Sequence, residues 1–179
     1  IRGAYGSVAA RRAIPMMKIE DFDKSKEVAL SLSKAWEFLS GEREIYDVYL
    51  EKAEIPAFAD YSVFLPLSVE SRTAGVGVLI HREDATVVAS HMFGLPKEDL
   101  PEDDLRDACA EVCNVFSGCV VPQVSDSPDV GIGLPLRASP QDFEEITKGS
   151  ALKLTYKCEH GTKRLFVLVY GMFLKPKTS

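Results

Sequence analysis

The stretch YSVFLPLSVESRTAGVGVLI, residues 61–80, decides the fold because it holds two β-rich runs separated by a short polar segment. The runs 61–70 and 75–81 are rich in β-branched, aromatic and other apolar residues, with 71–74 between them. They predict an antiparallel hairpin. A second hairpin is predicted from strands at 152–158 and 163–173, which flank the turn-forming residues 159–162.

Apolar residues recur three and four positions apart on both sides of the first hairpin, which is the spacing of an amphipathic helix. The expected helices cover residues 23–39, 85–93 and 102–118. Their expected caps are Asp23 or Ser25, Gly41, Asp84 and Gly94. The order of these elements, a helix followed by a hairpin, occurs twice and predicts an α+β fold with a mainly antiparallel sheet.

The remaining segments are shorter and more polar. Residues 45–52 predict a short strand, 122–128 a loop, and 140–148 a polar loop or helical turn. The extended segment 130–136 contains Pro135, which has no N–H to donate to a ladder. This segment is therefore expected at the end of a strand or at the edge of the sheet.

Charge and hydropathy exclude several classes of protein. The chain has 179 residues, with 21 Lys and Arg against 27 Asp and Glu, which gives a net charge of −6. A binder of nucleic acid or of an anionic membrane surface needs a basic surface, which this balance disfavours. No apolar run is long enough to insert into a membrane. We expect residues 1–20 to form a flexible extension and residues 21–179 a single domain.

Four cysteines are too few for a disulfide scaffold in a chain of this length: Cys109, Cys113, Cys119 and Cys158. They include no Cys-x-x-Cys pair, and the three histidines are scattered. We therefore expect reduced, partly buried thiols in a cytoplasmic protein, and no metal bound by this chain.

The helix at 102–118 carries the residues with chemical potential. Relative to Asp107, a helix of 100° per residue places Glu111 at about +40° and Asn114 at about −20°, so the three share a polar stripe. Gly118 follows on the same stripe and leaves the surface beside Asn114 open. A carboxylate can pair with a lysine, and a carboxamide can orient a water molecule. Such a pair suits hydrolysis of a phosphoryl group that another molecule supplies with its metal. A plain solvated helix face explains the same spacing.

The segment Asp107-Ala-Cys-Ala-Glu111-Val-Cys-Asn114 resembles the signature of the CheC/CheX/FliY chemotaxis phosphatases. That signature is Asp or Ser, three residues, Glu, two residues, Asn, and a Pro a little over twenty residues later. Pro135 follows Asn114 after 20 residues, one fewer than usual. The hairpin at 61–80 and the segment AEVCNVFSG also resemble the family, and the match covers residues 60–174.

The resemblance implies a CheC-like fold with helices on one face of the sheet, and a phosphatase acting on a phosphorylated CheY-like receiver domain. In that reading Glu111 docks on the receiver lysine and Asn114 positions the attacking water. Asp107 supports the helix face, Pro135 shapes the adjacent wall, and Mg²⁺ belongs to the receiver. Because Glu37 has Ser40 three residues later instead of Asn, the chain is more similar to the CheX branch, which keeps one motif.

Two other functions stay open at this point. Flagellar rotor proteins of the FliM and FliN kind have related architecture and act by assembly, so a non-catalytic binding module is the alternative. A thiol-dependent regulator using Cys109 or Cys113 is the third hypothesis. CheX-like proteins dimerise through their sheets, so the resemblance also implies a homodimer, with the runs 61–81 and 163–173 as candidate edges.

Overall fold

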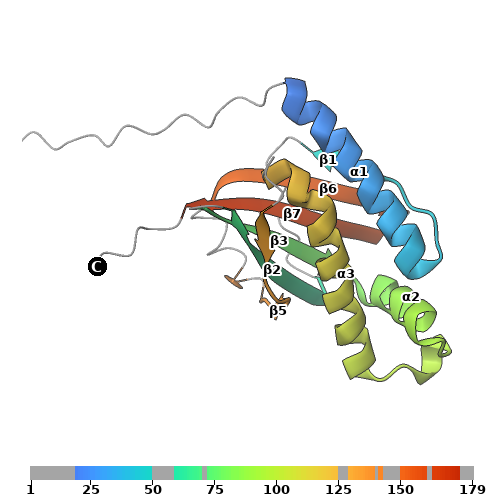
Figure 1. Ribbon diagram of the computed structural model, residues 1–179. Coiled ribbons are helices and arrows are strands. Elements are labelled where there is room, and N and C mark those ends of the chain that lie inside the picture. Colours follow the sequence, from blue (N-terminus) through green and yellow to red (C-terminus); the bar gives the residue numbers. More distant parts are fainter. Residues whose placement is uncertain are drawn as a thin grey trace, which may run out of the picture.

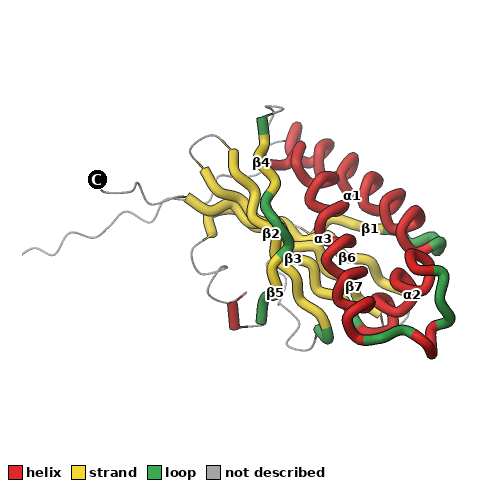
Figure 2. Tube along the Cα trace, turned by 60° about the horizontal axis from the view of Figure 1, so that its bottom comes forward, coloured by secondary structure: helices red, strands yellow, loops and turns green. Residues whose placement is uncertain are grey.

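One antiparallel sheet carries its helices on a single face (Figures 1 and 2). This computed structural model describes residues 19–49, 59–69, 72–124, 129–139, 141–142, 150–160 and 163–173. Within them the strand order is β1-β6-β7-β3-β2-β4, and β5 also pairs with β2. The strands are β1 (Tyr46–Tyr49), β2 (Tyr61–Val69), β3 (Arg72–Ile80), β4 (Val130–Ile132), β5 (Leu136–Arg137), β6 (Ser150–His160) and β7 (Lys163–Phe173). This arrangement confirms the predicted α+β class.

Both predicted hairpins are present. Strands β2 and β3 pair from Tyr61 opposite Ile80 to Val69 opposite Arg72, and β6 pairs with β7. Strand β3 begins at Arg72, three residues earlier than predicted, because residues 72–74 join the ladder. The predicted strand at 45–52 is confirmed over β1, and its last residues lie outside the described part of the chain.

Helix α1 (Ile19–Ser40) begins four residues before the predicted start. Asp23 and Ser25 therefore lie inside the helix, and the prediction that either one caps it was wrong. Ser25 is fully buried, so it packs within the fold. Gly41 ends the helix as predicted, with a φ of 74°. Residues 19 and 20 of the expected extension are helical, and the preceding residues lie outside the described part.

Helix α2 (Arg82–Phe93) follows β3 directly and is not capped by Asp84. Asp84 lies buried in the first turn, while the N-cap position is His81, which makes no capping side-chain bond. The acceptor for the start of the helix is instead Asp60, which precedes β2. Its Oδ2 accepts a 2.7 Å hydrogen bond from the backbone N–H of Arg82. Gly94 closes the helix in the left-handed conformation, as predicted.

Helix α3 (Glu102–Val124) follows the short 3-10 helix η1 (Lys97–Asp99) and runs six residues beyond its predicted end. The predicted loop at 122–128 was therefore wrong for residues 122–124, and 125–128 lie outside the described part. Pro122 lacks the donor that would bond the carbonyl of Gly118. The helix tolerates this loss because it ends only two residues later.

The sheet edge beside β2 is formed by β4 and β5 with a β-bulge between them. Ile132 pairs with Leu67, and Leu136 pairs with Phe64, so three edge residues face two residues of β2. Pro135 is one of those three, which confirms its predicted place at an edge. The segment 140–148 is described only at 141–142, which are helical.

The prediction that 61–81 and 163–173 supply an exposed edge was wrong. Strand β2 lies between β3 and β4, β3 lies between β2 and β7, and β7 lies between β3 and β6. Each of these strands has its backbone paired on both sides and so presents no free edge. Within the described residues the edges are β1 and the β4–β5 side.

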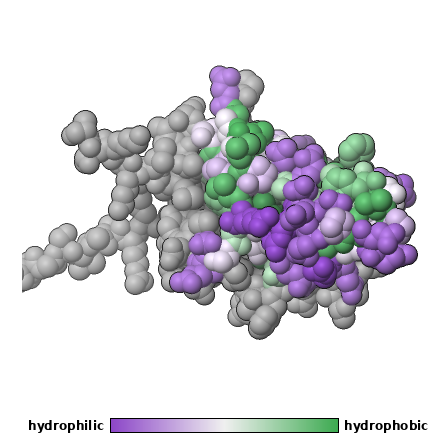
Figure 3. Space-filling view, turned by 90° about the horizontal axis from the view of Figure 1, so that it is seen from below, coloured by the Kyte–Doolittle hydropathy of each residue, from purple (hydrophilic) through white to green (hydrophobic). Residues whose placement is uncertain are grey.

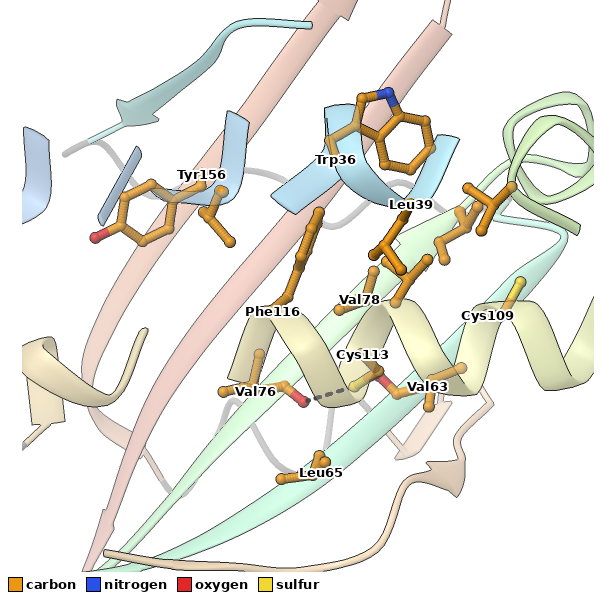
Figure 4. Packing of buried hydrophobic residues seen from close by; sticks show 14 of the residues in the cluster. Trp36, Leu39, Val63, Leu65, Val76, Val78, Cys109, Cys113, Phe116 and Tyr156 are labelled. Carbon is orange, nitrogen blue, oxygen red and sulfur yellow. Dashed lines mark hydrogen bonds between the residues drawn. The ribbon is translucent and has the colours of Figure 1, made fainter. Parts of the chain in front are cut away.

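The core lies between the sheet and helices α1 and α3. Figure 4 shows Phe116 of α3 pointing toward α1, with Tyr156 on one side and Leu39 on the other. The Phe116 ring meets Tyr46 edge to face at a centroid distance of 5.5 Å. The α3 side of this core consists of Leu105, Ala108, Cys109, Val112, Cys113, Phe116 and Val120. Val115 and Cys119 are partly buried against it.

Candidate functional site

The four predicted residues of α3 lie on the side of the helix away from the core. Asp107, Asn114 and Gly118 are exposed and Glu111 is half-buried. The intervening Ala108, Val112 and Phe116 are at most 1% exposed, which fixes the rotation of the helix. Packing of the apolar face therefore presents the polar stripe to the surroundings.

Gly118 leaves an open place next to Asn114 on this stripe. A Cβ atom built at Gly118 would have no neighbouring heavy atom within 4 Å outside the adjacent helix. Several other described glycines, in contrast, have close neighbours. A Cβ at Gly75 would lie 2.2 Å from Cζ of Phe64. The absence of a side chain at Gly118 is thus not required by packing, and it keeps the surface beside Asn114 low.

A cleft of about 340 Å³ runs beside the first half of α3. Its helix wall includes Arg106, Asp107 and Ala110, and its sheet wall is the chain at 59–63 and at 135–138. The structure therefore brings Asp107 and Pro135 to the same cleft. Glu111 and Asn114 do not line it and lie one and two turns further along the exposed stripe.

An ion-pair cluster around Glu102 fixes the start of α3. The Tyr61 hydroxyl donates to Oε1 of Glu102 at 3.1 Å, and Arg82 pairs with the same carboxylate at 2.9 Å. Arg106 adds a contact of 3.3 Å and lies over the Tyr61 ring. These residues come from β2, α2 and α3, so the cluster joins the starts of three elements beside the cleft.

The cluster also shifts the pKa values of its members. Burial raises the pKa of Tyr61, and its hydrogen bond to the Glu102 carboxylate raises it further. Desolvation alone would raise the pKa of Glu102, but hydrogen bonds from Tyr61 and Arg82, with the nearby positive charges, outweigh it and lower the pKa. Glu102 is therefore held as a carboxylate that binds its partners. The spacing of Glu102 and Arg106 was the one sequence signal for this cluster.

Cys109 and Cys113 point into the core, as predicted. They are 1% and 0% exposed, and Sγ of Cys113 lies 3.8 Å from the carbonyl oxygens of Val63 and Val76. Burial raises the pKa of each thiol to about 12. Neither sulfur is then a thiolate near neutral pH, which argues against a thiol-dependent regulator acting through these residues.

Two further features, a metal site and a membrane-spanning helix, are absent from the described residues. Within these ranges, His, Cys, Asp and Glu side chains form no group of three or more that could hold a metal ion. None of the described helices has the length and apolar character needed to cross a membrane.

Comparisons with known proteins give a fold but no sequence relative. No family model and no curated protein matches the chain. A CheC-like superfamily protein from Shewanella sp. PV-4 superposes with a TM-score of 0.63 at 13% identity, over 87% of this chain and 99% of that chain. Chemotaxis protein CheX from Vibrio vulnificus gives a TM-score of 0.62 at 14% identity, over 83% and 99%.

A third similar structure is the complex of CheX with CheY, BeF₃ and Mg²⁺ from Borrelia burgdorferi. Its TM-score is 0.62 at 16% identity, and the match covers 87% of this chain and 99% of that chain. All three matches span almost the whole of the compared chain, so the similarity extends across the sheet and its helices. The chain therefore has the fold of the CheC-like and CheX proteins.

Proposed function

We propose that this chain is a protein-phosphoaspartate phosphatase that acts on a CheY-like receiver domain. The observation that carries the proposal is the polar stripe on the outer side of α3, where Asp107, Asn114 and Gly118 are exposed and Glu111 is half-buried. The fold supports it, because one similar structure is a CheX protein in complex with CheY. A receiver-domain substrate also implies a cytoplasmic protein with a role in chemotaxis or two-component signalling.

Asn114 is proposed to hold the attacking water. Its carboxamide can accept one hydrogen bond and donate another, which orients a water molecule in line with the phosphorus atom. The water oxygen bonds to phosphorus, the bond from phosphorus to the aspartyl oxygen breaks, and a proton passes to solvent. The products are a free carboxylate and inorganic phosphate. Because the receiver supplies the phosphoryl group and its Mg²⁺, this chain needs no nucleophile or metal of its own.

Glu111 is proposed to dock the receiver by pairing with its lysine. Glu111 lies one turn before Asn114 on the same stripe, so one approach of the receiver can engage both residues. Asp107 adds a further negative charge on this face, and Pro135 lies across the cleft from it. The open surface at Gly118 gives the incoming domain room next to Asn114.

The test is the decay of phosphate on an autophosphorylated receiver with and without this protein. We expect faster decay with the wild type, and Asn114→Ala should reduce the acceleration about 100-fold or more, because the water loses its orientation. Glu111→Ala should raise the receiver concentration needed for half-maximal rate. Glu27→Gln, an exposed position on α1, is the control and should behave as wild type.

An unchanged decay rate across all receivers of the source organism would refute the enzymatic proposal. Saturable binding of a phosphorylated receiver without faster decay would instead favour the non-catalytic binding module. In that case Asn114→Ala would leave the dissociation constant unchanged, since only a hydrolytic step requires an oriented water.

A further inference from the structure

We propose that the bulged edge of the sheet is a second part of the receiver-docking surface, with Ile132 and Leu134 as its apolar contacts. We call these two residues the edge contact. The inference rests on the proposed function for the identity of the partner. It adds a surface outside α3 that would select among receivers by shape and apolar match.

The strand register determines which side chains of this edge face α3. Ile132 pairs with Leu67, which is fully buried under the helices, so the two side chains share the helix-covered face of the sheet. The bulge then reverses the alternation of side chains between the two faces of the sheet. Leu136 pairs with Phe64 and so lies on the face opposite the helices. Without the extra residue, Ile132 and Leu136 would face the same side.

Backbone hydrogen bonds fix the bulge against β2, and the Leu134 side chain stays largely exposed. The N–H of Gly133 donates to the carbonyl of Pro66 at 2.9 Å, and that of Ala138 donates to Ser62 at 3.1 Å. A Cβ at Gly133 would lie 2.7 Å from Cγ of Pro66, so the two chains are in close contact there. The segment is thus fixed in place by backbone contacts rather than by the exposed Leu134 side chain.

Both members of the edge contact are exposed although they are large and apolar. Ile132 is 49% exposed and Leu134 is 79% exposed, the highest value among the large apolar side chains of the described residues. Figure 3 shows this edge as an apolar strip next to the polar surface of α3. The cleft joins the two, because Asp107 lines one wall and the chain from Pro135 lines the other.

The charge of the neighbouring stripe identifies the occupant. A domain that covers both the edge contact and the α3 stripe meets Asp107 at the cleft and Glu111 one turn further along the helix, so a partner with a cationic group next to an apolar area fits this surface. A second copy of this chain would bring the two acidic stripes to one interface, where like charges repel. An anionic membrane surface is disfavoured for the same reason. A receiver whose lysine pairs with Glu111 meets the charge requirement.

The test compares two double variants of the full chain. Ile132→Ser with Leu134→Ser removes the edge contact. Leu30→Ser with Ile45→Ser removes matched side chains, which are 57% and 77% exposed and lie on α1 and just before β1, at the opposite edge of the sheet. For each we would measure the dissociation constant of receiver domains in beryllofluoride and Mg²⁺, the midpoint of urea unfolding, and the rate of phosphate loss at saturating receiver.

We expect the edge variant to weaken receiver binding about tenfold or more, as apolar anchors do in interfaces, and the control pair to change it less than about twofold. The saturated rate should stay the same, because Asn114 and Glu111 are intact. Equal dissociation constants for the two variants would overturn the inference while leaving the phosphatase proposal standing. Binding without phosphate loss would refute the phosphatase proposal, and the dissociation constants would still decide the edge contact. A wild type that binds no receiver would overturn both.

Discussion

The backbone N–H of Arg82 donates a 2.7 Å hydrogen bond to Oδ2 of Asp60, a residue 22 positions earlier in the chain. Asp60 thus supplies from the start of β2 the acceptor that the N-cap residue His81 does not supply to α2. A carboxylate at this end of a helix also meets the positive end of the helix dipole. The contact joins the hairpin to the helix that follows it.

Asp60→Ala is expected to lower the free energy of unfolding by about 1 kcal/mol, the usual cost of a lost helix cap. Asp60→Asn keeps an oxygen acceptor and should retain most of the stability. Urea unfolding followed by circular dichroism measures both. Equal stability of Asp60→Ala and wild type would show that the contact contributes nothing to folding.

Gly118→Ala is expected to raise the free energy of unfolding by about 0.5–1 kcal/mol, because alanine favours a helix interior and its Cβ meets open space. The same substitution at Gly75 should destabilise, since its Cβ would overlap the Phe64 ring. Thermal unfolding of both variants shows whether each substitution raises or lowers the free energy of unfolding. A larger side chain, as in Gly118→Leu, should keep the fold but slow the proposed acceleration of receiver dephosphorylation. Destabilisation by Gly118→Ala would show that the site is not open.

The thiols of Cys109 and Cys113 predict a loss of stability at alkaline pH. Burial raises their pKa from 9.0 to about 12, so between these values the unfolded chain releases protons that the folded chain retains. The free energy of unfolding should therefore fall as pH rises through this range, and be unaffected by these groups below it. The slope should be shallower in Cys109→Ala with Cys113→Ala.

Alkylation gives an independent check on the same two thiols. Iodoacetamide at neutral pH should modify Cys109 and Cys113 only after unfolding, as peptide mass spectrometry would detect. Rapid modification of either residue in the folded protein would contradict its burial. It would also bring back the hypothesis of a thiol-dependent regulator.

The acidic side chains of α3 predict a receiver association rate that falls with added salt. Between about 0.01 M and 0.15 M salt the Debye length drops from about 30 Å to about 8 Å, which screens the attraction of a lysine-bearing partner. Asp103→Asn with Asp107→Asn should reduce this salt dependence in stopped-flow measurements. Glu27→Gln with Glu42→Gln makes the same charge change elsewhere and should reduce it less. A rate that is independent of salt would leave these acids only the role of matching the helix dipole.

Residue composition was sufficient to predict the hairpins, and periodicity was sufficient to predict the rotation of α3, because both depend on which residues are apolar. The β-rich runs predicted the first hairpin, in which Val63 and Leu65 are buried, and the polar stripe of α3 lies on the side opposite Val112 and Phe116. The helix cap at Asp84 was predicted wrongly because the true acceptor comes from another strand. Local sequence has no signal for a partner so far away.

The candidate site was predicted in part for a related reason. The shared exposure of Asp107 and Asn114 follows from spacing within one helix, and the family resemblance named Pro135. The cluster joining Tyr61, Arg82 and Glu102 depends on how three elements meet, which spacing within one element does not reveal. The edge contact depends on a one-residue change of register, which becomes visible only when both sides of the ladder are known.

The bulge at Gly133–Pro135 has a further consequence for solubility. A straight, unpaired strand edge is a template on which other chains can aggregate, and this edge carries exposed apolar side chains. The strand register shifts by one residue after Ile132, and Pro135 has no N–H. This edge therefore has no long run of hydrogen-bond donors and acceptors in register. The same irregularity that leaves Leu134 exposed therefore protects the protein from edge-to-edge strand pairing with other chains, which an apolar edge would otherwise favour.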